Sequence, residues 1–129
     1  MNIEFELKKL LKKSIGGIPQ IGAILEVEKD GETKYYKGVA IKNHIFRDII
    51  SAEQGAISSA LINGEDPLTF KTIYIMTSST SLSDLKYIRT DFLMTYLQDK
   101  SEVYLYTQYG KKAVVTVSSL KNKIIESSL

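Results

Sequence analysis

The segment Ser51-Ala52-Glu53-Gln54 carries the side chains best suited to acid–base or nucleophilic chemistry. A serine followed three residues later by a glutamine is a capping box, so a helix should begin at Ser51, with Glu53 in its first turn. A carboxylate placed there could act as a general acid or base, although the helix dipole alone also favours it. Ser51 could be a nucleophile with His44 as its base. The simpler interpretations are a capping serine, a first-turn carboxylate and a hydrogen-bonding surface histidine.

Metal-binding chemistry is restricted by the composition of the chain. The sequence contains no cysteine, and its one histidine is His44. Disulfides and thiolate metal sites are therefore excluded. A structural zinc site needs four nitrogen or sulfur ligands and a catalytic one usually needs three protein ligands, so one histidine with carboxylates makes a poor zinc site. Magnesium and calcium, which prefer oxygen ligands, remain compatible with the sequence, but we expect no cofactor.

Three other groups of residues have both a functional and a structural interpretation. The hydroxyl-rich segment 77–81, just before an expected helix start at 83–84, could hold a phosphate, but we favour a plain loop with a helix cap. The tyrosines could stack on bases, but most of them fall in expected strands, where aromatic residues are common. A net charge of +2 is too small to indicate a nucleic-acid partner by itself. The densest basic group lies on an amphipathic helix and is best explained as a solvated face: Lys8, Lys9, Lys12 and Lys13.

Hydrophobic periodicity predicts alternating helices and strands along one domain, residues 1–129. We expect helices near 3–11, from Ser51 to Asn63-Gly64, over 85–97 and around 120–125. We expect strands at 21–28, 33–41, 70–76, 103–107 and 113–117, with hairpins at Asp30-Gly31 and around Gly110. Residues 43–50 should form a connecting segment. Helices between strands favour a layered α/β domain, and the two hairpins favour a mixed sheet.

Length and composition describe an ordinary globular chain. The 129 residues include 43% apolar and 25% charged residues, which suits one domain with a real core. No apolar run approaches the ~20 residues needed to cross a bilayer. The first residues lack the basic start and apolar stretch of a signal peptide. We therefore expect a cytoplasmic protein with no membrane partner.

The order of elements and four short motifs resemble the small cytidine deaminases. The motifs are a first strand at 21–25, a glycine-led segment at 38–43, the helix start at 51–56, and Gly64 at the helix end. The resemblance covers roughly residues 3–125. It implies a three-layer α/β/α cytidine-deaminase-like fold with a five-stranded mixed sheet. It also implies a homo-oligomer, either a dimer or a tetramer, because small members of that family assemble as tetramers.

The resemblance also indicates where the catalytic groups of that family should fall. Those enzymes hold zinc with three histidine or cysteine side chains at the starts of two neighbouring helices, and a glutamate that does not bind the metal moves protons. By that alignment Ser51 occupies the first ligand position. Lys86 and Arg89 fall near the other two, with a possible shift of one residue. Glu53 falls at the position of the proton-shuttling glutamate.

The substrate positions differ from the family as well. An asparagine and a glutamate hold the ribose hydroxyls in that family, whereas this chain has Ala40 and Lys42 at those positions. Asn43 is retained, and the position of an aromatic residue that faces the base falls near Pro19. Alanine offers no side-chain hydrogen bond and lysine reverses the charge. The resemblance thus implies the scaffold of the family without its metal ligands or its ribose contacts.

Three functions are compatible with this sequence. The first is a degenerate, zinc-free protein that does not deaminate cytidine by the family mechanism and that binds a nucleoside-like molecule or acts as a scaffold or regulator. The second is a divergent nucleoside or nucleobase hydrolase or deaminase that uses Glu53 as its acid or base. The third is a nucleic-acid-binding or structural oligomer. We favour the first, with no nucleic-acid partner. We also expect bulky or charged side chains, such as those of Lys42, Lys86 or Arg89, to fill the space where cytidine deaminases hold their metal.

Overall fold

The structure is a computed structural model that describes residues 1–17, 19–43, 47–83 and 90–120. Within these ranges the chain forms helices, strands and short 3-10 segments, with a further helical turn at 117–120. In chain order these are α1 (Ile3–Leu11), β1 (Ile21–Lys29), β2 (Glu32–Val39), β3 (Ile41–Asn43), β4 (Arg47–Ile50), α2 (Ala52–Ile62), η1 (Pro67–Thr69), β5 (Phe70–Thr77), α3 (Thr90–Tyr96), β6 (Glu102–Thr107) and β7 (Lys112–Thr116). No helix in the described part of the chain is long and apolar enough to cross a membrane.

The main sheet has five strands in the order β2-β1-β5-β6-β7. Strand β1 is antiparallel to both β2 and β5, β5 is parallel to β6, and β6 is antiparallel to β7. The predicted five-stranded mixed sheet is therefore confirmed. Because Ile21 pairs with Thr77, and Thr77 pairs with Thr107, the start of β1 lies at the same end of the sheet as the ends of β5 and β6.

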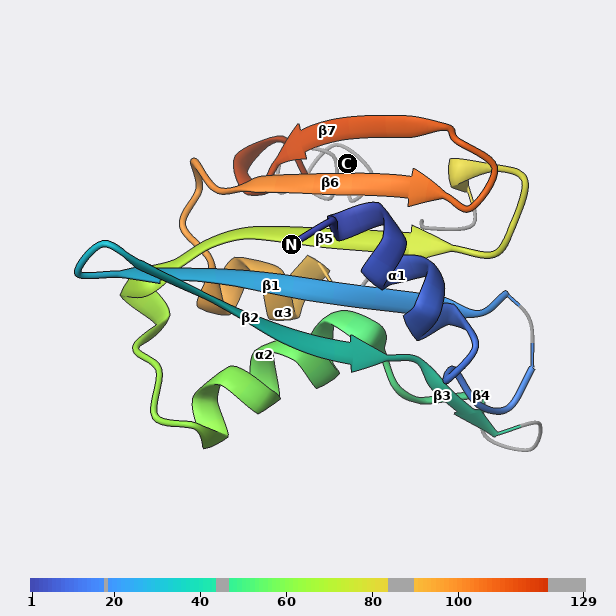
Figure 1. Ribbon diagram of the computed structural model, residues 1–129, viewed down its shortest axis with the longest axis horizontal. Coiled ribbons are helices and arrows are strands. Elements are labelled where there is room, and N and C mark those ends of the chain that lie inside the picture. The colour runs from blue at the N-terminus through green and yellow to red at the C-terminus, as the bar shows by residue number, and fades with distance from the viewer. Residues whose placement is uncertain (18, 44–46, 84–89, 121–129) are drawn as a thin grey trace, which may run out of the picture.

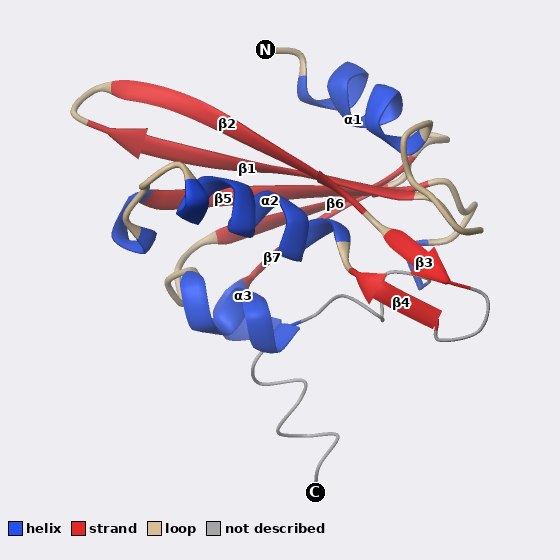
Figure 2. Ribbon diagram, turned by 90° about the horizontal axis from the view of Figure 1, so that it is seen from below, coloured by secondary structure: helices blue, strands red, loops and turns tan. Residues whose placement is uncertain are grey.

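Helices cover both faces of this sheet, so the domain has three layers. Helix α1 lies on one face, whereas α2 and α3 lie on the other (Figures 1 and 2). The larger core fills the space between the sheet and the α2–α3 layer, and it is built around Leu25, Ile57, Phe70, Ile73 and Leu93. The smaller core joins α1 to the sheet through Leu7, Leu10, Ile24, Met76 and Tyr106 among others.

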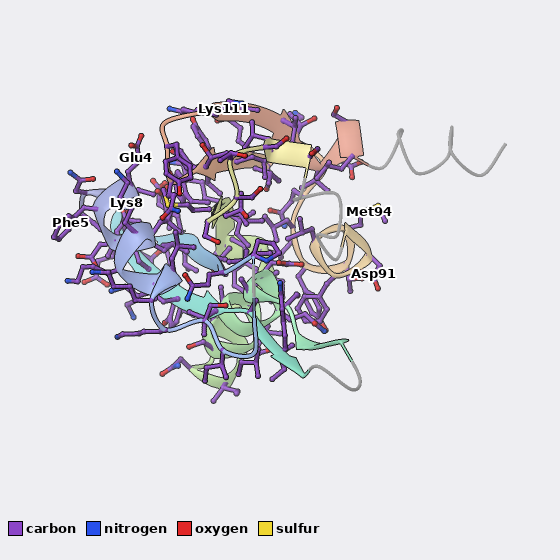
Figure 3. All side chains as sticks on the ribbon, turned by 90° about the vertical axis from the view of Figure 1, so that its right-hand side faces the viewer. Glu4, Phe5, Lys8, Asp91, Met94 and Lys111 are labelled. Atoms are coloured by element: carbon purple, nitrogen blue, oxygen red, sulfur yellow. The ribbon has the colours of Figure 1, made fainter. Side chains whose placement is uncertain are left out.

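Short-range sequence signals formed the expected local structures. The Asp30-Gly31 hairpin joins β1 to β2, and both residues have positive φ values of 54° and 81°, as a tight two-residue turn requires. Gly110 has a φ of 98° in the turn between β6 and β7. Helix α1 buries Leu7, Leu10 and Leu11 on its sheet-facing side, whereas the exposed Phe5 points away from the sheet (Figure 3). The periodicity of 3.6 and 2 residues therefore predicted these elements correctly.

The expectation of a simple connection over 43–50 is wrong. Residues 41–43 and 47–50 pair as an antiparallel hairpin, β3–β4, that projects from the end of the main sheet (Figure 2). The expected strand 33–41 is also divided at Ala40. The N–H of Ala40 donates to Ile21 O at 2.9 Å, while its carbonyl accepts the N–H of Ile15 at 3.1 Å and the hydroxyl of Ser14 at 2.8 Å. The first bond continues the β1–β2 pairing, and the other two hold the chain against the segment after α1 where it leaves the main sheet.

Two expected helices lie only partly within the described residues. Helix α3 covers Thr90–Tyr96, and residues 85–89 of the predicted helix 85–97 lie outside the described ranges. The helical turn at 117–120 begins before the last helix expected around 120–125, and residues 121–129 also lie outside these ranges. Val117, expected to end the last strand, instead starts this turn, and its N–H donates to Ser101 O at 3.0 Å.

Several tyrosines lie together on the α1 side of the sheet. The rings of Tyr74 and Tyr104 are 5.0 Å apart, those of Tyr104 and Tyr106 are 6.4 Å apart, and the ammonium of Lys112 lies 5.2 Å from the centre of the Tyr104 ring. The hydroxyl of Tyr74 donates to Glu26 Oε1 at 3.0 Å. These rings therefore contact one another and a neighbouring lysine, which supports their structural interpretation as strand residues.

Alkaline pH should destabilise the protein through these tyrosines. Burial, together with the hydrogen bond to Glu26, raises the pKa of Tyr74, and burial raises the pKa of Tyr106. An unfolded tyrosine titrates near pH ~10, so the stabilisation is complete below that pH and is lost as the pH rises above it. Urea unfolding at increasing pH should show a steeper loss of stability in the wild type than in Tyr74→Phe. Tyr109→Phe, at an exposed position, is the matched control and should keep the wild-type slope.

Candidate functional site

The candidate site is the region around the first turn of α2, at the end of the sheet from which the β3–β4 hairpin emerges (Figure 2). Helix α2 approaches β2 very closely there. A Cβ atom added to Gly38 would lie 2.3 Å from both the carbonyl oxygen of Ala52 and the nitrogen of Ala56. Only glycine fits at this contact, because any side chain would overlap the backbone of the helix. This close contact fixes the position of Ser51 and Glu53 relative to the sheet.

Ser51 caps helix α2 as the sequence predicted. Its Oγ accepts the N–H of Gln54 at 3.3 Å and donates to Gln54 Oε1 at 3.1 Å. Gln54 Oε1 also accepts the N–H of Ser51 at 3.1 Å, which completes the capping box. The hydroxyl is thus used both as donor and as acceptor within the cap. This arrangement supports the structural interpretation of Ser51.

Removing this cap should have a measurable cost. Ser51→Ala should lower the free energy of unfolding by about 1 kcal/mol, since the orphan N–H of Gln54 loses its acceptor. Ser51→Asp, which keeps an acceptor at the cap, should remain close to the wild type. Urea denaturation of the two variants checks this. Equal loss in both would mean that the serine does more than cap the helix.

Glu53 is buried in the first turn of α2. Its side chain is 2% exposed, and it is among the largest fully buried side chains of the described residues. Buried carboxylates are rare unless they are paired or hydrogen-bonded, and Glu53 does have an interaction partner. Its neighbours on the same helix face, Ala52, Ala56 and Ile57, belong to the main core. The carboxylate therefore lies at the border between the core and the N-terminal end of the helix.

Lys42 connects two segments at this end of the molecule. Its ammonium donates to the carbonyl oxygen of Pro19 at 2.6 Å, and its backbone N–H donates to Ile15 O at 2.8 Å. The resemblance to cytidine deaminases placed Lys42 at a ribose contact and Pro19 near a base contact. The structure brings these two positions into direct contact with each other. Ala40 is 3% exposed and packs in the core, and Asn43 pairs with Arg47 in the β3–β4 hairpin.

Ser14 supports the same connection, and no sequence motif indicates its role. Its hydroxyl is almost buried, donates to Ala40 O at 2.8 Å and accepts the N–H of Ile21 at 3.4 Å. One side chain thereby links the segment after α1 to the start of β1 and to the end of β2. A serine just beyond a helix is too ordinary a feature to reveal such a role.

The loop after β5 is held by its own hydrogen bonds. Ser78 Oγ accepts the N–H of Gln20 at 2.8 Å, and Gln108 Nε2 donates to Ser78 O at 3.0 Å. Thr77 Oγ1 accepts the N–H of Ser79, and Ser79 Oγ accepts the N–H of Ser81. These contacts support the interpretation of 77–81 as a structural loop and not as a phosphate cup. His44, Lys86 and Arg89 lie outside the described residues.

The donor atoms present do not fit a zinc ion of the deaminase type. The chain has no cysteine and one histidine, and the hydroxyl of Ser51, at the expected first ligand position, is engaged in the helix cap. In the described part of the chain no three histidine, aspartate or glutamate side chains gather as a metal site would require. These side chains therefore do not supply the ligand set of a catalytic zinc ion.

Two pockets lie at the opposite end of the sheet. One of about 220 Å³ is lined by Lys29, Asp30, Lys34 and Glu65, among others, at the β1–β2 hairpin. A more open one of about 580 Å³ lies between the same hairpin, η1 and the segment before β6. Neither contains Lys42, Ser51 or Glu53. These pockets are therefore separate from the candidate site.

The arrangement of layers and strands in this chain is shared with solved structures of cytidine deaminases. A crystal structure of cytidine deaminase from Burkholderia pseudomallei has a TM-score of 0.73 with this chain, over 90% of this chain and 94% of that one, at 20% sequence identity. Cytidine deaminase from Mycobacterium leprae has a TM-score of 0.63, over 93% and 97% of the two chains, at 15% identity. No protein-family model and no curated protein sequence matches the chain. The predicted fold is thus confirmed.

Proposed function

We propose that this protein uses the cytidine deaminase fold without its chemistry: it holds no catalytic zinc, does not deaminate cytidine, and acts as a scaffold or regulatory protein. The hydrogen bond between the Lys42 ammonium and Pro19 O carries this proposal. If Lys42 and Pro19 stand where a nucleoside's ribose and base would be held, a direct bond between them takes the place of the ligand. The lack of cysteine and the use of Ser51 as a helix cap support the same conclusion.

Cytidine turnover and binding test this proposal together. Purified protein without a histidine tag should release no ammonia from cytidine above the rate in buffer. Addition of cytidine should also leave the amide NMR spectrum unchanged at residues near β3 and α2. Lys42→Met should remove the bond to Pro19 and should still not deaminate cytidine, because no metal site is restored. Ammonia release by the wild-type protein would contradict the proposal.

The buried carboxylate of Glu53 supports a second candidate, a divergent nucleoside or nucleobase hydrolase that acts without zinc. A carboxylate at the N-terminal end of a helix and at the edge of the core is well placed for general acid–base catalysis. A screen of nucleosides and nucleobases for ammonia release tests it. Activity that is present in the wild type and lost in Glu53→Gln would establish this function in place of the scaffold role.

A further inference from the structure

Strand β7 forms one outer edge of the main sheet and pairs only with β6 among the described strands (Figure 1). The N–H of Thr107 donates to Lys111 O at 2.9 Å and that of Val117 donates to Ser101 O at 3.0 Å. Main-chain bonds in an antiparallel pair alternate, so 113 and 115 also bond to β6. The main-chain N–H groups of Lys112, Val114 and Thr116 therefore point away from the sheet.

The two outer edges of the sheet differ in how well they are protected against pairing. Strand β2 carries charges along its length, at Glu32, Lys34 and Lys37. Strand β7 reads Lys-Ala-Val-Val-Thr, without a proline, and the side chain of its central residue, Val114, is 45% exposed. Charged residues, prolines and bulges are the devices that keep edge strands from pairing with other chains. The centre of β7 has none of them.

We propose that the β7 strands of two copies of this protein pair antiparallel about a two-fold axis at Val114, so that the sheet continues from one copy into the other. In this register Val114 faces the partner's Val114 and exchanges both main-chain hydrogen bonds with it. Ala113 then faces the partner's Val115, and Lys112 faces the partner's Thr116. Each of these pairs is compatible in size and charge, so the strand is complementary to itself.

The charges beside this edge also suit a second copy. Glu102 pairs with Thr116 inside each chain, and its side chain is exposed on the same face of the sheet as Lys112. In the two-fold pair, Lys112 of one copy therefore lies beside the partner's Thr116. The partner's Glu102 lies one strand further on, on the same face of the sheet. Opposite charges approach at both ends of the paired strands, and no like charges face each other there. An unrelated extended peptide would lack this symmetry.

Sedimentation velocity over a range of concentrations tests the pairing. The wild type should form dimers, or larger assemblies built from them, and the short strand predicts that dissociation occurs on dilution. Val114→Pro removes an N–H that β6 does not use, so the fold should persist while the assembly mass falls by half. Val114→Thr keeps this N–H and should assemble like the wild type. A monomeric wild type, or an unchanged assembly in a folded Val114→Pro variant, overturns the proposal.

A single-cysteine variant tests the register directly, because the natural chain contains no cysteine. Residues that exchange both hydrogen bonds across an antiparallel pair have Cα atoms ~5.5 Å apart. Val114→Cys should therefore be joined into a covalent dimer by a short bismaleimide. Thr33→Cys, on the opposite edge strand, should give far less. Equal cross-linking of the two variants contradicts pairing at Val114, and neither outcome depends on whether the protein deaminates cytidine.

Discussion

Gly38→Val should prevent helix α2 from docking on the sheet. The nearest atoms to an added Cβ, at 2.3 Å, belong to the backbone of Ala52 and Ala56 and cannot rotate away as a side chain would. Overpacking usually costs 1–3 kcal/mol, and we expect the upper end of about 3 kcal/mol or more because the whole helix must move. Since the first turn of α2 carries Ser51 and Glu53, the candidate site should be lost together with the stability.

Urea denaturation of Gly38→Val and Gly55→Ala measures this contact from both sides. Gly55 lies on α2 opposite Gly38, but a Cβ added to it would come no closer than 3.2 Å to Gly38 Cα. In a helix, replacing glycine by alanine gains about 1 kcal/mol, which should offset most of that tight contact. Gly55→Ala should therefore stay within about 1 kcal/mol of the wild type. Wild-type stability in Gly38→Val would show that α2 does not approach β2 as described.

The second large effect is expected from Ile57→Ala, on the buried face of α2. Ile57 is 0% exposed and belongs to the main core, so its truncation should cost about 2–5 kcal/mol. Ile57→Val should cost about 0.5–1.5 kcal/mol, because the loss of one methylene leaves a smaller cavity than the truncation to alanine does.

Ile62 gives a matched control for this substitution within the same helix. Its side chain is 84% exposed, and Ile62→Ala should change the unfolding free energy by less than about 0.5 kcal/mol. Chemical denaturation of the three variants checks the order of their effects. Similar losses in Ile57→Ala and Ile62→Ala would contradict the direction in which α2 faces the sheet.

Local signals explain which parts of the fold could be predicted from sequence. The Ser51 capping box and the Asp30-Gly31 turn depend on a few consecutive residues, so their chemistry is visible in the sequence. Apolar runs indicate the strands, and the 3.6-residue period of the apolar residues indicates the helices. The expected layers and mixed sheet then followed from the order of elements and from the resemblance to cytidine deaminases.

The features that sequence reasoning missed depend on contacts between distant segments. The β3–β4 hairpin is the exception, because it is local but pairs only three and four residues, too few for a clear alternating pattern. The departure of the chain from β2 at Ala40 depends on bonds that the carbonyl of Ala40 accepts from Ser14 and Ile15. The bond from Lys42 to Pro19 joins residues 23 positions apart through a backbone carbonyl, which no side-chain pattern can reveal. The sequence shows that Lys42 differs from the residue found at this position in cytidine deaminases. It does not show that Lys42 bonds to Pro19.

The role of Glu53 shows the same limit. The sequence placed it in the first turn of a helix, which the structure confirms, and the side chain proves to be buried. An exposed first-turn carboxylate and a buried one look identical in sequence, because burial depends on how α2 packs against the sheet. This burial keeps the hydrolase as the second candidate function.

The most direct test of a deaminase fold without deaminase chemistry is elemental analysis of the purified protein after removal of any histidine tag. With no cysteine and one histidine per chain, we predict zinc far below stoichiometric amounts, even after incubation with excess zinc followed by dialysis. Stoichiometric zinc that survives dialysis would contradict the account, since it would require a metal site built from His44 and carboxylates and would return the protein to the class of metal-dependent hydrolases.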